Sequence, residues 1–172
     1  MQSLTDSGPV ELSFDVGKEK ELRFSVNAKH KAKLTMTKGR AEIFGSELVL
    51  KKTYTFTDRN IAIFTWHGCT LELSGTGIVM PYVSDTSPMR TYLDVHASLE
   101  EKRRQAKLSG HAGPVVMIVG PVDAGKSTLC HILLNYAVRR GHVPIFADLD
   151  VGQTSVSVPG SISAAPLTEC ID

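Results

Sequence analysis

The sequence is poor in the residues that build disulfide or metal frameworks. It has three cysteines, Cys69, Cys130 and Cys170, which are odd in number and far apart. No disulfide framework or zinc-ligand spacing results from them. The six histidines are also scattered, and no two of them have the helical or hairpin spacing of a metal-ligand pair. We therefore expect a chain that folds around an apolar core in a reducing, intracellular compartment.

Long apolar runs and a charge excess are lacking as well. No apolar segment approaches the roughly 20 residues that a membrane span needs, and the polar start at residues 1–6 does not resemble a signal peptide. The net charge of +1 creates no global field that would favour nucleic acid or membranes. With 42% hydrophobic and 22% charged residues, the composition is that of a globular protein with one domain or two small ones. We expect no membrane partner.

The most informative segment that is present is Gly120–Ser127, which fits the pattern G-x-x-x-x-G-K-[ST]. This is the phosphate-binding P-loop, in which glycines let the backbone turn successive N–H groups toward one point. Lys126 is placed to contact the β- and γ-phosphates of a nucleotide as a point charge. The Ser127 hydroxyl is placed to coordinate Mg²⁺.

The residues around the motif predict the strand–loop–helix context that it requires. Residues 115–119 form a short apolar run rich in β-branched residues, typical of a strand buried on both faces of a parallel sheet. After the loop, apolar residues recur at helical spacing, and Gly141 is placed to end this helix as its C′ residue. The helix would then direct its positive N-terminal end at the phosphates.

A second strand is predicted at residues 143–150, ending in Asp148 and Asp150. Alternation places both carboxylates on one face. Ligands of doubly wound sheets bind beyond the carboxyl ends of the strands. We therefore expect both aspartates near the metal of the P-loop, with a turn-initiating Asp pair as the structural alternative.

The first half of the chain has a different pattern. Short segments alternate apolar and polar residues between turn residues, which predicts an all-β sandwich or barrel. The predicted strands are centred on residues 12–14, 22–26, 33–36, 54–56 and 69–73, and the predicted turns lie at Gly17, Gly39, Gly45, residues 58–60, Gly68 and Gly75.

A helix is predicted to connect the two halves. Ser87 and Pro88 form a good N-cap and N1 pair before an apolar pattern of helical spacing. The predicted organisation is a β domain at 1–86, a connecting helix and linker at 87–112, and the beginning of an α/β P-loop domain at 113–172. Because two strands and one helix cannot complete a doubly wound sheet, we expect this last domain to be truncated.

With these pieces placed, the chain resembles the eukaryotic RNA 5′-hydroxyl polynucleotide kinases of pre-mRNA cleavage complex II and the tRNA-splicing endonuclease complex. The resemblance runs from near residue 10 to near the end of the chain. It rests on residues 41–48, 64–69, 73–75, 119–128, 133–137, 148–153 and 155–160.

The resemblance implies an N-terminal β-sandwich domain, a central P-loop kinase domain and a third domain, of which this chain would hold the first and the opening of the second. It implies ATP and Mg²⁺ as cofactors, with Lys126 and Asp150 as catalytic residues and Ser127 and Asp150 at the metal. Glu21 matches a glutamate that helps to hold the nucleotide base. Asn60 matches a nucleotide-contacting position that is commonly lysine in the family. The nucleotide-binding residues implied in this way are Glu21, Asn60, Gly120, Asp123, Ala124, Gly125, Lys126, Ser127 and Thr128.

The implied activity is transfer of the γ-phosphoryl group of ATP to an RNA 5′-hydroxyl. The implied partners are RNA 5′-hydroxyl ends, mRNA 3′-end processing factors and tRNA-splicing endonuclease subunits, and the implied location is the nucleus. Two alternatives stay open at this stage: a scaffold that binds ATP without turning it over, and another P-loop ATPase or GTPase. A transporter-type ATPase is disfavoured, since Leu-Ser-Gly occurs at 73–75 and 108–110, before the P-loop rather than after it.

Overall fold

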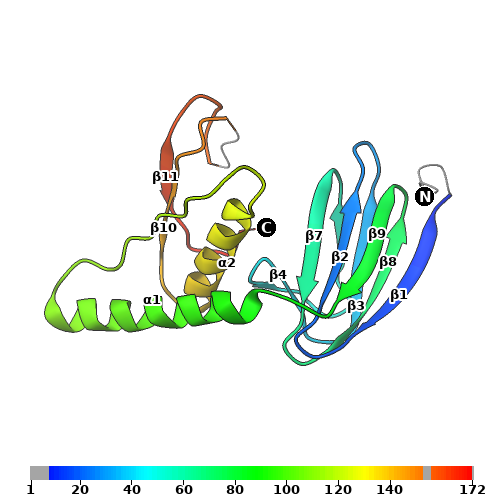
Figure 1. Ribbon diagram of the computed structural model, residues 1–172, viewed down its shortest axis with the longest axis horizontal. Coiled ribbons are helices and arrows are strands. Elements are labelled where there is room, and N and C mark those ends of the chain that lie inside the picture. Colours follow the sequence, from blue (N-terminus) through cyan, green and yellow to red (C-terminus); the bar gives the residue numbers. More distant parts are fainter. Residues whose placement is uncertain (1–7, 153–155, 172) are drawn as a thin grey trace. The chain divides into compact units, whose positions relative to one another are not determined.

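The computed structural model describes residues 8–152 and 156–171 (Figure 1). The chain divides into two compact units, which we call the β unit, through Arg90, and the P-loop unit, from Thr91 onward. In the described residues, no helix is both long enough and apolar enough to cross a membrane.

The β unit consists of two antiparallel sheets, which confirms the predicted β-sandwich class. One sheet has the strand order β1-β8-β3-β6 and the other has the order β5-β4-β7-β2-β9. The strands are β1 (Val10–Val16), β2 (Glu21–Val26), β3 (Ala32–Gly39), β4 (Glu42–Ile43), β5 (Ser46–Glu47), β6 (Thr53–Phe56), β7 (Arg59–Phe64), β8 (Cys69–Gly75) and β9 (Ile78–Ser84).

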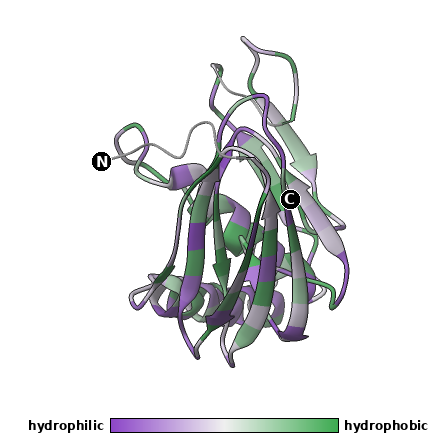
Figure 2. Ribbon diagram, turned by 90° about the vertical axis from the view of Figure 1, so that its right-hand side faces the viewer, coloured by the Kyte–Doolittle hydropathy of each residue, from purple (hydrophilic) through white to green (hydrophobic). Residues whose placement is uncertain are grey.

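Alternation along the strands builds the core between the two sheets. On β2, Leu22 and Phe24 are buried and point inward, whereas Arg23 lies on the opposite face. Phe24 meets Phe56 of the other sheet edge-to-face, with ring centroids 6.1 Å apart. Figure 2 shows hydrophobic and hydrophilic residues alternating along the strands. Each buried apolar side chain of this kind contributes about 1.5–3 kcal/mol to folding.

All five strands that the alternation predicts are present, but four others were not predicted. These are β4, β5, β7 and β9. The predicted turn at residues 58–60 is wrong in part, because Arg59 and Asn60 are the first residues of β7. Asp58 alone of the three has a left-handed backbone, with φ of 48°. β7 begins at Arg59 because Arg59 and Asn60 already pair with Val26 and Ser25 of β2.

The connecting helix begins as predicted. Helix α1 spans Met89–Ser109, and the Met89 N–H donates to Ser87 Oγ at 3.3 Å. Ser87 thereby satisfies one of the backbone donors that a helix N-terminus leaves without an intrahelical acceptor.

The helix predicted after the P-loop is also present, as α2 (Lys126–Arg139). It ends in a Schellman motif, in which Gly141 N–H donates to Val138 O at 2.8 Å and His142 N–H donates to Ala137 O at 3.0 Å. Gly141 has φ of 80°, a left-handed value that favours glycine. The sequence prediction of Gly141 as the C′ residue is therefore confirmed.

The strands of the P-loop unit differ from the prediction. The second predicted strand is present as β10 (Ile145–Asp148), but it pairs antiparallel with β11 (Ser163–Pro166), which was not predicted. Residues 115–119 form no strand, and Val115 is 96% exposed. A strand needs a hydrogen-bonding neighbour, and among the described residues β10 pairs with β11 instead. The prediction of a buried parallel strand at 115–119 is therefore wrong for this structure.

Candidate functional site

The P-loop is an exposed turn between the extended segment 115–119 and α2. Asp123 and Gly125 have left-handed backbones, with φ of 60° and 80°, and Ala124 N–H donates to Pro121 O at 3.4 Å. Asp and Gly are among the residues that best tolerate this conformation. The sequence thus allows the backbone to curl directly before the helix begins.

Lys126 is the first residue of α2, and its side chain folds back over the loop. Its Nζ donates to Pro121 O at 2.7 Å. A Cβ added at Gly120 would lie 3.6 Å from Lys126 Cγ, on the side of the loop along which the lysine chain runs. The ammonium group therefore stands on the loop that the motif predicts as the phosphate site.

The N-terminus of α2 has the features of an anion site. Gly125, its N-cap residue, supplies no side-chain hydrogen bond, and the first turn contains no acidic residue. The first N–H groups of a helix have no intrahelical acceptor and carry the positive end of the helix dipole. Ser127 and Thr128 add hydroxyl groups to this turn. The donor set of N–H groups, one ammonium and two hydroxyls fits a polyphosphate.

The same turn fits a metal ion held largely by phosphate. No group of three or more His, Cys, Asp or Glu side chains that could hold a metal occurs in the part of the chain that the structure describes. Mg²⁺ is usually bound by one or two protein oxygens together with phosphates and waters. The Ser127 hydroxyl and one nearby carboxylate would be sufficient protein ligands.

The two aspartates after the P-loop helix differ in their surroundings. Asp148, the last residue of β10, is 6% exposed, and its Oδ1 accepts the N–H of Asp150 at 3.0 Å. Asp150 lies beyond the strand and is exposed, and its Oδ1 accepts the Gly152 N–H at 3.0 Å. The expectation that both carboxylates share one face of a strand is wrong, since β10 ends at Asp148.

The fold places the end of β10 toward the start of α2. Figure 1 shows β10 returning alongside α2 in the opposite direction. The rings of His131 and Phe146 lie 6.1 Å apart, edge-to-face. Burial, together with the charge of Asp148, raises the pKa of the Cys130 thiol. Because Cys130 lies one helical turn after Ser127, Asp148 and Asp150 belong to the P-loop end of this unit.

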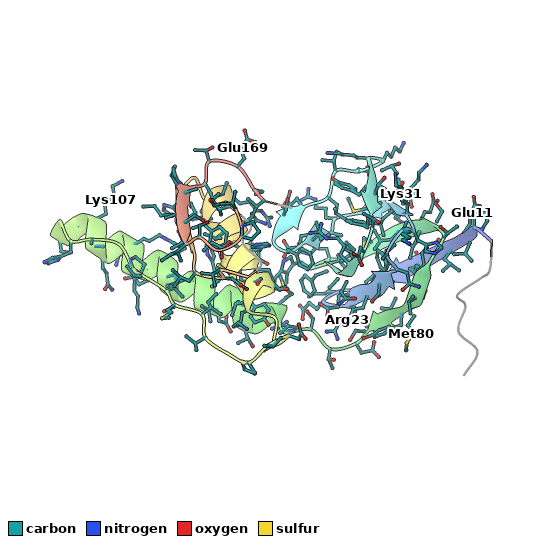
Figure 3. The ribbon with its side chains drawn as sticks, turned by 90° about the horizontal axis from the view of Figure 1, so that it is seen from above. Glu11, Arg23, Lys31, Met80, Lys107 and Glu169 are labelled. Atoms are coloured by element: carbon teal, nitrogen blue, oxygen red, sulfur yellow. The ribbon has the colours of Figure 1, made fainter. Side chains whose placement is uncertain are left out.

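Glu21, in the β unit, is buried rather than solvated. It is 4% exposed, and its carboxylate pairs with the Arg23 guanidinium and accepts the Ser87 hydroxyl at 2.7 Å. Arg23 is labelled in Figure 3. Burial works against the charge of Arg23, but hydrogen bonds with Tyr82 and Glu21 raise its pKa. Glu21 is therefore not a solvated strand carboxylate. The predicted base contact of Glu21 stays a prediction.

Asn60 lies in the same sheet, and its Oδ1 accepts the Ser25 hydroxyl at 2.6 Å. In the register of β2 and β7, Glu21 lies opposite Phe64 and Asn60 lies opposite Ser25. The two predicted nucleotide-contacting residues share a face of the sheet but are separated by about 13 Å along the strands. The structure therefore does not bring them together.

One polar residue was missed by the sequence interpretation. Asn135 on α2 is fully buried, donates from Nδ2 to Ile171 O at 2.8 Å, and accepts the Ile171 N–H on Oδ1 at 2.8 Å. The signal was present in the sequence, because Asn135 interrupts the apolar residues 132–137 of α2. A buried amide in such a position needs partners for its polar atoms.

Comparison with known proteins identifies both halves of the chain. Residues 15–106 match the family model of the N-terminal beta-sandwich domain of polyadenylation factor, and residues 120–172 match that of the mRNA cleavage and polyadenylation factor CLP1 P-loop. A zebrafish (Danio rerio) protein named polyribonucleotide 5′-hydroxyl-kinase Clp1 is 53% identical over 167 residues, which are 95% of this chain and 38% of that protein. The human protein of the same name is 51% identical over 152 residues, which are 88% of this chain and 36% of that protein.

Solved structures give the same result. The chain is similar to a structure described as the extended interface between Pcf11p and Clp1p, with a TM-score of 0.82 and 26% identity, over 93% of this chain and 38% of that one. It is also similar to the wild-type Clp1p–Pcf11p complex, with a TM-score of 0.81 and 27% identity, over 96% and 38% of the two chains. The chain thus spans somewhat more than a third of the length of these relatives. On these matches, the chain belongs to the CLP1 family of mRNA cleavage and polyadenylation factors, and it comprises the family's β-sandwich domain and the start of its P-loop domain.

Proposed function

We propose that this chain forms the ATP-binding part of an RNA 5′-hydroxyl polynucleotide kinase. The observation that carries the proposal is the P-loop itself: a curled backbone, the uncapped N-terminus of α2 and the Lys126 ammonium lie together on one exposed turn. The relatives named as 5′-hydroxyl kinases support the choice of this activity among those of P-loop proteins.

The roles of the residues follow from phosphoryl-transfer chemistry. Bound ATP would supply the γ-phosphoryl group, and Mg²⁺ would neutralise charge on its oxygens. Lys126 would exchange its contact with Pro121 O for the phosphates. Ser127 would hold the metal ion through its hydroxyl. Asp150 is exposed, and it would orient the metal's water shell or accept the proton of the RNA 5′-hydroxyl.

Glu21 is proposed to contact the nucleotide base, and Asn60 is proposed to contact the nucleotide. The buried carboxylate of Glu21 is suited to accept a hydrogen bond from the exocyclic amine of adenine, which guanine does not offer at that position. We also propose, from the likeness to Clp1p bound to Pcf11p, that the protein assembles with mRNA 3′-end processing factors in the nucleus. RNA 5′-hydroxyl ends and tRNA-splicing endonuclease subunits complete the proposed partners.

A second candidate is an ATP-bound scaffold that holds partners without turning nucleotide over. The specific observation in its favour is that the similar solved structures are complexes with a partner protein. The two functions differ in what loss of Lys126 does. A kinase loses phosphoryl transfer to a 5′-hydroxyl RNA, whereas a scaffold loses co-purification with its partner.

Nucleotide binding by the 172-residue chain tests the common basis of both functions. Lys126→Ala removes a charge-assisted contact worth about 1.5–3 kcal/mol, so the Kd of a fluorescent ATP analogue should rise about 10- to 100-fold. Ser127→Ala should weaken binding in Mg²⁺ but not in EDTA. The matched control is Lys102→Ala, which removes an exposed lysine from α1. If Lys126→Ala binds the analogue as tightly as Lys102→Ala does, the P-loop assignment is wrong.

A further inference from the structure

The proposed mechanism gives no role to the buried carboxylate of Asp148. Asp148 is 6% exposed at the end of β10, where its backbone pairs with Ser163 of β11. Burying a carboxylate is costly unless hydrogen bonds satisfy it. The cost therefore has to be offset by what the carboxylate holds in place.

The carboxylate of Asp148 holds the backbone of Asp150. Its Oδ1 accepts the Asp150 N–H at 3.0 Å, at the point where the chain leaves the ladder between β10 and β11. Beyond this point Asp150 has no ladder position, so that hydrogen bond fixes its backbone where the strand no longer does. Asp150 then continues the turn by accepting the Gly152 N–H at 3.0 Å.

Asp148 lies close to the P-loop helix. Its charge acts on the Cys130 thiol, one helical turn after Ser127, and the neighbouring ring pair of His131 and Phe146 packs α2 against β10. The buried carboxylate therefore stands between the first turns of α2 and the backbone of Asp150.

We propose that Asp148 is a positioning residue, which sets the place of Asp150 relative to the P-loop by accepting its backbone N–H. This inference rests on the proposed role of Asp150 at the metal ion. Asp148 acts through the acceptor geometry of its Oδ1 and is not a metal ligand. Residues that hydrogen-bond to a metal ligand without touching the metal typically change the metal affinity about 10-fold or more when they are removed.

The test compares Asp148→Ala with Asp148→Asn. Asparagine keeps an Oδ1 acceptor of the same reach but removes the charge. The readout is the ratio of the Kd of a fluorescent ATP analogue in EDTA to its Kd in Mg²⁺, measured on the 172-residue chain. Asp150→Ala defines full loss of the metal's contribution, and Asp94→Ala, which removes an exposed aspartate from α1, is the matched control.

We expect Asp148→Ala to lower this ratio about 10-fold, as Asp150→Ala does, and Asp148→Asn to stay within about twofold of the wild type. Two results overturn the inference. One is an Asp148→Ala ratio that matches the control while Asp150→Ala loses the effect. The other is an Asp148→Asn ratio as low as that of Asp148→Ala, because this would make the charge and not the acceptor the active feature.

Hydrogen exchange of the Asp150 amide provides a readout that does not depend on nucleotide. The Asp150 amide should be protected from exchange in the wild type and in Asp148→Asn. If this amide exchanges in the wild type as fast as in an unstructured peptide, the inference is overturned. If Asp148→Ala fails to fold, which its Kd in EDTA would reveal, this measurement and Asp148→Asn decide the question. If neither the wild type nor Asp150→Ala responds to Mg²⁺, the proposed function fails, and the role of Asp150 fails with it.

Discussion

The buried amide of Asn135 leads to the sharpest prediction about stability. It joins α2 to the segment after β11 by two hydrogen bonds of 2.8 Å to the backbone of Ile171. Asn135→Ala removes both. Each hydrogen bond contributes about 1 kcal/mol net, and the space left by the side chain costs about 1 kcal/mol more. Ile171 is half-buried, so water can partly satisfy its released backbone groups. The expected loss is about 3 kcal/mol in the free energy of unfolding of the P-loop unit.

The measurement is urea unfolding followed by circular dichroism at 222 nm, because α2 and most of α1 lie in the P-loop unit. The chain has a single tryptophan, Trp66, which lies in the β unit and reports on that unit by fluorescence. In Asn135→Ala the circular dichroism transition should move to lower urea while the fluorescence transition stays in place. A loss below about 1 kcal/mol, or an equal shift of both transitions, would refute this account of Asn135.

Asn135→Asp separates the two hydrogen bonds. A carboxylate can accept the Ile171 N–H but cannot donate to the Ile171 carbonyl, and it places a charge in a fully buried position. Burial should raise the pKa of this introduced carboxyl above its value of about 3.9 in the unfolded chain. The variant should therefore lose stability as the pH rises through the folded-state pKa and recover it in acid. A pH-independent deficit equal to that of Asn135→Ala would show that the charge has no effect.

Three further predictions concern the core, the pH dependence and the thiols. Leu73 is fully buried in the β unit, so Leu73→Ala should cost about 3–4 kcal/mol in the fluorescence transition and leave the circular dichroism transition unchanged. Burial lowers the pKa of His96 in the P-loop unit, so below pH about 6.5 the unfolded state binds more protons than the folded state. The free energy of unfolding should therefore fall from pH 7 to pH 5, and this fall should be smaller in His96→Gln. Burial raises the pKa of Cys69 to about 11, so a thiol reagent at pH 8 should modify it only after denaturation, and fast labelling of the native protein would contradict its burial.

The parts of the fold that could be predicted are those whose signal is local. Five strands of the β unit (β1, β2, β3, β6 and β8) alternate within a few residues, Ser87 precedes α1, and Gly141 follows α2, and each of these features lies where the sequence predicts it. The P-loop belongs to this class, because a curled loop followed by a helix N-terminus is encoded within eight consecutive residues.

The parts that could not be predicted depend on partners far away in the sequence. β11 forms from a Ser- and Ala-containing segment with little apolar pattern of its own. It is a strand because it pairs antiparallel with β10. Residues 115–119 show the opposite case, since a segment with a strong strand pattern forms no strand and is largely exposed where no neighbour among the described residues pairs with it. Strand propensity describes the fit to a half-buried sheet, and a sheet requires a partner.

The same reasoning explains why the carboxylates were harder to place than the P-loop. Alternation along β2 puts Glu21 on the face away from the core, yet the carboxylate is buried, and it pairs with Arg23 and accepts the hydroxyl of the distant Ser87. Asp148 and Asp150 differ by two positions, and the end of β10 between them makes one a buried acceptor and the other an exposed acid. The P-loop motif determines the phosphate-binding groups that its own eight residues provide. The carboxylates that complete such a site take their roles from tertiary contacts, and substitutions that keep an acceptor while removing a charge are therefore the means of assigning those roles.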